Sequence, residues 1–377
     1  MLPIEQALDA YRRADYTTAL RLLQPLAQSS NAIAQAHLGY LYFNGNGVPQ
    51  DLAAGVLWIR SAAERGVAGA MSSLGDIYHQ GKGAPQSHQQ AVLWYRRAAE
   101  QGDPAAMTKL GRMYQDGTGT ARDIKQAMDW YWQAARRGDA EGQLLLARGC
   151  LSIDGMKRPM HAYLWALAAM LGGAKGADAV LADAARENDA ATRAAMQVRL
   201  GDMYFHGKDI PRNYAAAAAL LKGPEAANDP RALSIMGMLY MGGKGVQRDL
   251  TAAAEWFRRA AERGEATAQF NLSVLYGNGE GVPVDHEAAL MWCRAAAING
   301  DSRAMYRMSF LYTAGQGVER SSEMALAWAS LAAARGNLDA VQTRASLMQR
   351  MSQAEVDTAF RIAESLLVQE TPLAESA

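Results

Sequence analysis

A spacing of 36 residues recurs along most of this chain. It separates the tyrosines in two series, which are Tyr42, Tyr78 and Tyr114, then Tyr204, Tyr240, Tyr276 and Tyr312. Tryptophans keep the same period at Trp58, Trp94 and Trp130, and at Trp256, Trp292 and Trp328. Cys150 stands 36 residues after Tyr114, where the next tyrosine would be expected. Trp165 comes 35 residues after Trp130, one residue earlier than the period predicts. Self-similarity at a fixed period of this size is the signature of a repeat protein that stacks small structural units.

Each unit has the pattern of a helix, a turn and a second helix. In the second unit, residues 70–79 have helical spacing and Gly81 to Pro85 interrupt it. Glycine adopts the left-handed conformation that ends helices, and proline does not continue them. Residues able to cap the second helix follow the turn in seven units, at Asp51, Ser87, Asp123, Asn213, Asp249, Asp285 and Ser321. Arg158 stands at that place in the fourth unit. The pattern therefore predicts an all-α solenoid of about eight units with capping helices.

A small residue lies three positions before each tyrosine, at Gly39, Gly75, Gly111, Gly201, Gly237, Ser273 and Ser309, with Ala147 before Cys150. A small residue lets the second helix approach closely. We expect the repeated tryptophan to fill the adjoining space, so that Trp94 and Trp292 are core residues. A bulky replacement would overpack the unit.

The composition excludes several classes of function. The 377 residues include 38 Lys plus Arg and 38 Asp plus Glu, which provides no net charge for strong non-specific nucleic-acid binding. There is no apolar run of transmembrane length. Two cysteines, Cys150 and Cys293, are too few for a disulfide framework or a four-cysteine zinc site. The first residues do not resemble a signal peptide, which favours a cytoplasmic protein, or a periplasmic one if a leader was removed before Met1.

These motifs resemble the Sel-one-like repeat family, a branch of the tetratricopeptide-like α-solenoids. The resemblance rests on residues 34–48, then Asp51 to Trp58, then Ala62, Ala63 and Gly66, and their counterparts over residues 31–336. It implies an adaptor or scaffold. Some secreted bacterial members carry a disulfide in each repeat, and this chain lacks those cysteines.

The period is interrupted between Trp165 and Leu220, where 19 additional residues are inserted. The inserted stretch, residues 175–189, resembles the helix-rich C-terminal end, residues 337–368, and family members often end in such a cap. We therefore predict an N-terminal module of residues 1–190 and a C-terminal module of residues 191–377. The alternative is one continuous solenoid with a tolerated insertion.

No catalytic, metal or cofactor motif is found. H-E-x-x-H, C-x-x-C and G-x-S-x-G are absent from the sequence, and the six histidines show no ligand spacing. The glycines at 242–245 form a repeat turn, because they follow a helix and lack the G-K-[ST] ending of a phosphate loop. We expect no catalytic residue, metal or cofactor, and Cys150 and Cys293 to be small packing residues.

The first helices of a stacked repeat line its concave side, so their variable positions form the candidate binding surface. In the first module these positions are polar and include Tyr40, Lys109, Arg112 and Arg148. In the second they still include Arg307, but they become increasingly apolar through Ile235, Met238, Val274 and Phe310. Alternatively, these apolar residues pack against the neighbouring stack or a second copy of the chain.

The leading hypothesis is a non-catalytic bacterial scaffold that binds a protein or peptide segment in this groove. Met238, Val274 and Phe310 would then form the central anchor. The alternative is an envelope-associated protein that binds peptidoglycan or polysaccharide, with aromatic residues such as Tyr40 and Trp58 stacking on sugars. A homo-oligomer is compatible with either hypothesis.

Overall fold

The structure is a computed structural model, and it describes residues 3–153, 155 and 157–369, with the side chains of 367–369 left aside. The described residues form helices and no strands, as the repeat pattern predicts. The chain divides into two compact units, Met1–Arg193 with Asp209–Pro211, and Ala194–Lys208 with Arg212–Ala377. Whether these units are separate folding domains stays a prediction.

The first unit contains α1 (Pro3–Arg12), α2 (Tyr16–Gln28), α3 (Ala32–Asn44), α4 (Leu52–Glu64), α5 (Ala68–Gln80), α6 (His88–Glu100), α7 (Pro104–Asp116), α8 (Ile124–Arg136), α9 (Ala140–Ser152), α10 (Pro159–Leu171) and α11 (Ala177–Arg186). Helix α12 (Ala190–His206) begins in the first unit and continues into the second. The second unit then contains α13 (Tyr214–Leu221), a short 3-10 turn (Pro224–Ala226), α14 (Pro230–Gly242), α15 (Leu250–Ala261), α16 (Ala266–Asn278), α17 (His286–Ile298), α18 (Ser302–Ala314), α19 (Ser322–Ala334), α20 (Leu338–Met348) and α21 (Gln353–Gln369).

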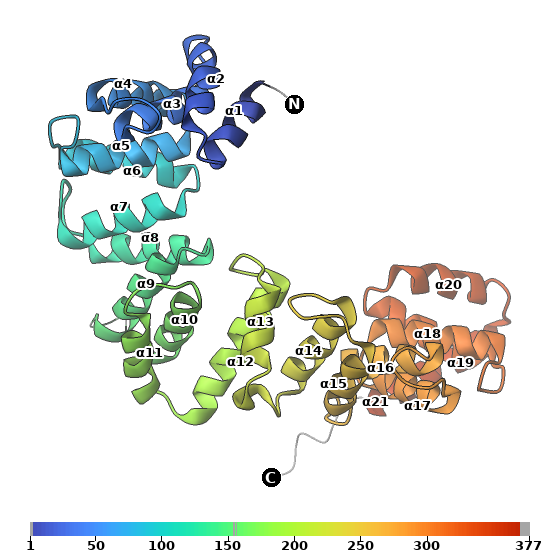
Figure 1. Ribbon diagram of the computed structural model, residues 1–377. Coiled ribbons are helices and arrows are strands. Elements are labelled where there is room, and N and C mark those ends of the chain that lie inside the picture. The colour runs from blue at the N-terminus through green and yellow to red at the C-terminus, as the bar shows by residue number, and fades with distance from the viewer. Residues whose placement is uncertain (1–2, 154, 156, 370–377) are drawn as a thin grey trace. The chain divides into compact units, whose positions relative to one another are not determined.

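The sequence signals set the ends of these helices. All seven predicted capping side chains accept a hydrogen bond from a backbone N–H in the first turn of the second helix. Arg158 makes no such bond at the start of α10, as predicted. First helices end in left-handed glycines such as Gly81, with φ of 72°. Within each compact unit, the two helices of one repeat stack on the two helices of the next repeat, as α5 to α8 show (Figure 1).

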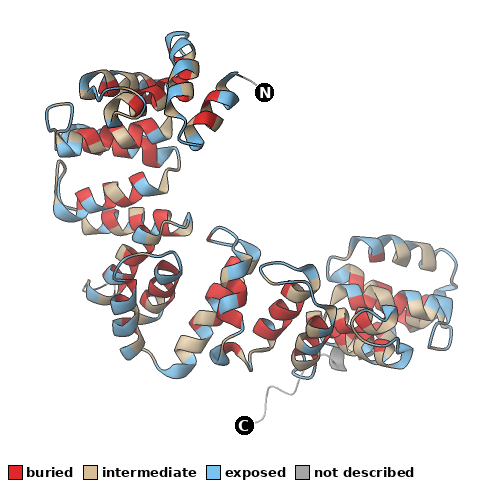
Figure 2. Cartoon of the chain, viewed as in Figure 1, coloured by how far each residue is buried: buried red, intermediate tan, exposed pale blue. Residues whose placement is uncertain are grey.

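Each repeat buries the surfaces where its two helices meet (Figure 2). The glycine of the first helix lies against the residue that follows the tryptophan, and the expectation that the tryptophan itself fills this space is wrong. A Cβ atom at Gly39 would lie 2.7 Å from the Ile59 side chain, and one at Gly111 would lie 2.5 Å from the Tyr131 ring. The helix crossing brings the neighbouring position of the second helix, one residue further along, over the glycine.

Large and small residues are matched across this contact, 20 residues apart in the sequence in seven of the eight repeats. Five glycines face large partners, in the pairs Gly39–Ile59, Gly75–Tyr95, Gly111–Tyr131, Gly201–Leu221 and Gly237–Phe257. Where the small residue is serine, its counterpart is also small, in Ser273–Cys293 and Ser309–Ala329. The summed volume is thereby kept within what a close-packed interior accepts.

The tryptophans differ in burial. Trp94, Trp165 and Trp328 are buried, with 6%, 6% and 1% of their surface exposed. Trp58 and Trp292 are half-buried and pack against core clusters of their own units. The prediction of core rings is therefore confirmed for Trp94 and only partly for Trp292.

Candidate partner-binding site

Three apolar side chains occupy the same position on successive first helices of the second unit. Met238 lies on α14, Val274 on α16 and Phe310 on α18. Met238 and Val274 are half-buried, whereas Phe310 has 57% of its surface exposed. We call these three residues the apolar stripe. Only Phe310, the member nearest the C-terminus, is exposed.

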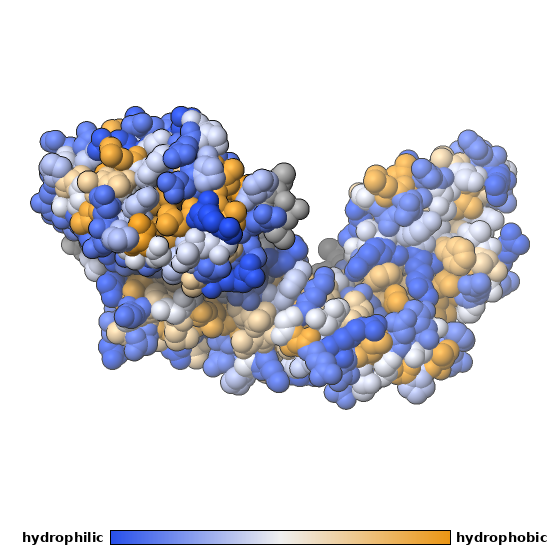
Figure 3. Space-filling view, turned by 45° about the horizontal axis from the view of Figure 1, so that its top comes forward, coloured by the Kyte–Doolittle hydropathy of each residue, from blue (hydrophilic) through white to orange (hydrophobic). Residues whose placement is uncertain are grey.

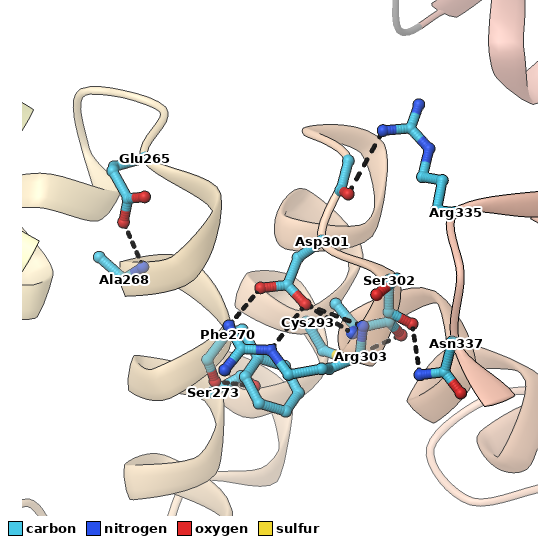
Figure 4. Close-up of polar contacts among 12 residues, drawn as sticks. Glu265, Ala268, Phe270, Ser273, Cys293, Asp301, Ser302, Arg303, Arg335 and Asn337 are labelled. Carbon is cyan, nitrogen blue, oxygen red and sulfur yellow. Dashed lines mark hydrogen bonds and ion pairs between the residues drawn. The ribbon is translucent and has the colours of Figure 1, made fainter. Parts of the chain in front are cut away.

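Polar contacts support the two helices that carry Val274 and Phe310. Asp301 caps α18 by accepting from the backbone N–H groups of Arg303, at 2.9 Å, and Ala304, at 3.3 Å. The Arg303 guanidinium lies over the ring of Phe270 on α16, with 4.4 Å between them. Asn337 Nδ2 donates to the carbonyl of Ser302 at the start of α18 (Figure 4). The Arg303–Phe270 and Asn337–Ser302 contacts link helices of different repeats, whereas the Asp301 cap stabilises the start of α18 itself.

Ile235 lies one helical turn before Met238, but only 1% of its surface is exposed. Its position faces the preceding repeat. The equivalent residues of the first unit do the same, because Ser73 contacts Tyr40 and Lys109 contacts Asp76. We call the interface between successive repeats a joint. An apolar residue at this position is buried in a joint, so Ile235 is not an accessible groove residue.

The basic residues predicted in the first unit lie on the surface, but two of them are neutralised. Lys109 Nζ lies 2.7 Å from Asp76 Oδ2, and Arg112 pairs with Glu141. Asp76 also accepts from the Tyr95 hydroxyl at 2.7 Å. Arg148 is exposed and makes no ion pair among the described residues. The three side chains therefore do not form one continuous field of positive charge.

Tyr40 is half-buried at the joint between the first two repeats. Its hydroxyl accepts a hydrogen bond from Ser73 Oγ at 3.3 Å, and its ring makes an edge contact with His37. Burial raises the pKa of Tyr40 above its ordinary value, so the hydroxyl stays protonated at neutral pH. Tyr40 is therefore a joint residue with little free ring surface.

A pocket of about 630 Å³ adjoins the apolar stripe between α16, α17 and α18. Leu290 and Leu311 contribute apolar surface, and Arg307 and His286 contribute polar groups. Arg307 precedes Phe310 by one helical turn and makes no ion pair among the described residues. Sequence reasoning placed Arg307 on the variable face but did not select it, because only the structure shows that it lines a pocket.

Apolar side chains also appear elsewhere on the surface. On the face seen in Figure 3, hydrophobic residues form small patches separated by hydrophilic ones. Leu57, Trp132 and Leu338 are among the large apolar residues that are at least 46% exposed. Exposure alone therefore does not identify a binding site, and a candidate needs a pocket or a repeated pattern as well.

Other chemistry is sparse in the part of the chain that the structure describes. No group of three or more His, Cys, Asp or Glu side chains is arranged to hold a metal ion there. No helix within the described residues is long and apolar enough to cross a membrane. Cys150 and Cys293 are buried free thiols, and burial raises the pKa of both.

Comparisons with known proteins identify the repeat. The family model of the Sel1 repeat matches residues 32–67, 68–103, 104–139, 194–222, 230–265, 266–301 and 302–337. Helices α9 and α10 form the remaining predicted unit, which lies outside these segments. No curated protein matches the chain.

Two solved structures are similar over most of the chain. One is a protective antigen present in uropathogenic Escherichia coli strains, which displays an SLR fold. It is 27% identical, covers 95% of this chain and 98% of its own, and has a TM-score of 0.41. The other is a Sel1 repeat protein from Oxalobacter formigenes, which is 28% identical, covers 87% of this chain and 89% of its own, and has a TM-score of 0.39.

Proposed function

The chain belongs to the Sel1 repeat family, and we propose that it is a non-catalytic scaffold that binds a protein segment along the first helices of its second unit. Sel1 repeat proteins are generally protein-interaction scaffolds. The observation that carries this proposal is the apolar stripe of Met238, Val274 and Phe310, which ends in an exposed aromatic ring. Phenylalanine and methionine are enriched in the cores of protein interfaces relative to the rest of the protein surface.

The adjoining pocket suggests the chemistry of the bound segment. Apolar side chains of the partner would contact the stripe and the leucines of the pocket. A carboxylate of the partner would pair with Arg307, whose planar guanidinium suits such an ion pair. We therefore propose that the bound segment is extended and apolar, with an acidic residue.

The experiment compares two phenylalanines of the second unit. Crosslinking pull-downs with the intact protein identify a partner, and its affinity is then measured for wild type, Phe310→Ala and Phe360→Ala. Phe360 is the control, because it is 37% exposed and lies on α21, which carries none of the three stripe residues. Loss of Phe310 is expected to weaken binding by about 1–3 kcal/mol, or roughly 5- to 150-fold.

Thermal melts separate binding from folding. Because Phe310 is exposed, Phe310→Ala should melt close to wild type. A variant that binds as tightly as wild type sinks the proposal. A large loss of stability would instead indicate that Phe310 has a packing role and would reject it as a binding anchor.

Peptidoglycan or polysaccharide binding is the competing hypothesis. It relied on Tyr40 and Trp58 as stacking rings. Tyr40 is half-buried in a joint, and Trp58 is half-buried against a core cluster. Co-sedimentation of the intact protein with peptidoglycan, equally strong for wild type and Phe310→Ala, would favour this hypothesis over the scaffold.

A further inference from the structure

One joint between repeats departs from a pairing that several other joints share. A basic residue of a second helix donates to the tyrosine hydroxyl of the following repeat, 18 residues later. The Arg60–Tyr78 bond is 2.8 Å and the Arg258–Tyr276 bond is 3.1 Å, and Arg96 pairs with Tyr114 in the same way. In the same register the sequence has Lys222 with Tyr240 and Arg294 with Tyr312.

At the joint between α8 and α9 both members of this pair are replaced. Trp132 stands where five other repeats have a basic residue, and Cys150 stands where the other repeats have tyrosine. The Trp132 ring is 46% exposed and lies under the Arg136 guanidinium, 4.5 Å away. This joint therefore lacks the tyrosine ring that accepts from an arginine at other joints, and it has an exposed indole instead.

A pocket of about 480 Å³ lies at this joint, within the first unit. Its apolar walls are Met128, Trp132, Leu146, Cys150 and Trp165. The repeat register directs a side chain at position 150 toward this space, because tyrosine at the equivalent positions reaches the residue that aligns with Trp132. The pocket therefore lies where the other joints hold a phenol ring.

The polar residues of the pocket carry an excess of positive charge. Lys125 and Arg158 contribute two cations, and Asp129 contributes one carboxylate. Neither Lys125 nor Arg158 makes an ion pair among the described residues. The backbone N–H of Arg158 donates to the Cys150 carbonyl at 2.8 Å, which fixes Arg158 beside the pocket. His161 also lines the pocket.

We propose that this pocket binds an aromatic side chain of a protein partner, with acidic residues flanking the aromatic one. The two indoles and the Met128 thioether provide the contacts that aromatic rings prefer. The cations at the pocket favour neighbouring carboxylates. The site lies in the first unit, so it adds a contact to the proposed scaffold and does not depend on the apolar stripe.

The test uses short peptides and the indole N–H signals of the eight tryptophans, observed by NMR in the full chain labelled with nitrogen-15. Acetyl-Glu-Tyr-Glu-amide at millimolar concentration should shift the signals of Trp132 and Trp165 and leave those of the second unit unchanged. Acetyl-Glu-Ala-Glu-amide should shift neither signal. Acetyl-Lys-Tyr-Lys-amide should bind about tenfold more weakly, the effect of roughly one charged contact.

A double variant fills the pocket with the residues used at the other joints. Trp132→Arg with Cys150→Tyr recreates the basic–tyrosine pair, so it should melt at or above the wild-type temperature. In this variant the peptide should no longer shift the Trp165 signal. If the double variant fails to fold, Lys125→Glu with Arg158→Glu keeps the walls and reverses the charge, and it should weaken binding of the acidic peptide.

Three results would overturn the proposal. The first is the absence of any shift with the acidic tyrosine peptide, and the second is unchanged binding by the folded double variant. The third is a shift of the two indole signals by a chito-oligosaccharide with none by the peptide, which would assign the pocket to a sugar. Peptide binding here together with an inert Phe310→Ala would retain this site and reject the proposed stripe.

Discussion

A Cβ atom added to Gly75 would lie 2.5 Å from two carbon atoms of the Tyr95 ring. Gly75 is on α5 and Tyr95 is on α6, so this contact sets how closely the two helices of the repeat approach. Tyr95 is 2% exposed, and its hydroxyl is held by Asp76. The ring therefore has little freedom to move away.

Gly75→Ala is accordingly expected to lower the free energy of unfolding by about 1–3 kcal/mol through overpacking. The measurement is urea denaturation followed by circular dichroism. Gly69→Ala is the control on the same helix, because the nearest atom to its new Cβ is the Tyr40 hydroxyl oxygen at 3.8 Å. That variant should be as stable as wild type or slightly more so.

The partner residue provides a second check on the same contact. In a Tyr95→Cys background, which imitates the Ser273–Cys293 pair, Gly75→Ala should cost less than it does in the wild type. Equal costs in the two backgrounds would mean that the ring does not restrict the glycine.

Trp94 and Trp292 occupy equivalent places but should differ in their effect on stability. Trp94→Ala is expected to cost about 3–5 kcal/mol, because its ring is 6% exposed and its loss leaves a cavity. Trp292→Ala should cost less, since its ring is half-buried. Denaturation of the two variants under identical conditions tests this order, and a larger loss for Trp292→Ala would contradict it.

Helix capping gives a comparison between the third and fourth repeats. Asp123 Oδ1 accepts from the Gln126 N–H at 3.0 Å, and Asp123→Ala should cost about 1 kcal/mol. Arg158 occupies the equivalent place before α10 and makes no side-chain cap, so Arg158→Ala should leave stability nearly unchanged. Thermal melts of both variants provide the measurement, and equal losses would show that capping does not explain either result.

The thiols should be protected in the folded chain. Burial raises the pKa of Cys293 to about 11 and also raises the pKa of Cys150. At pH 8 both should react slowly with a thiol reagent and rapidly after addition of denaturant. Single Cys→Ser variants assign the two reaction phases, and fast labelling of native protein would contradict the burial of these groups.

The same shift predicts the dependence of stability on pH. The thiol of Cys293 holds its proton more tightly in the folded chain than in the unfolded chain. Its contribution to the free energy of unfolding is therefore complete below the ordinary thiol pKa of about 8.5. That contribution is lost as the pH rises through the folded value of about 11. As the pH rises between these two values, the free energy of unfolding should decrease less for Cys293→Ala than for wild type.

Much of the fold was predictable from residues that act locally. Glycines such as Gly81 end helices because of their left-handed backbone, and side chains such as Asp123 begin helices by capping free N–H groups. These effects involve neighbours in the sequence, so a 36-residue period was sufficient to predict the repeats. The helical stretch at residues 175–189 was predicted for the same reason, and α11 lies within it.

Contacts between helices could not be predicted in the same way. The repeat pattern indicated that Gly75 needs a close neighbour, but the crossing of α5 and α6 brings Tyr95 there in place of Trp94. Spacing likewise placed Lys109 on the variable face, and only stacking paired it with Asp76 of the preceding repeat. Such contacts depend on the rotation and separation of helices, which arise from the packing of many side chains together and have no signature in the spacing of any one residue.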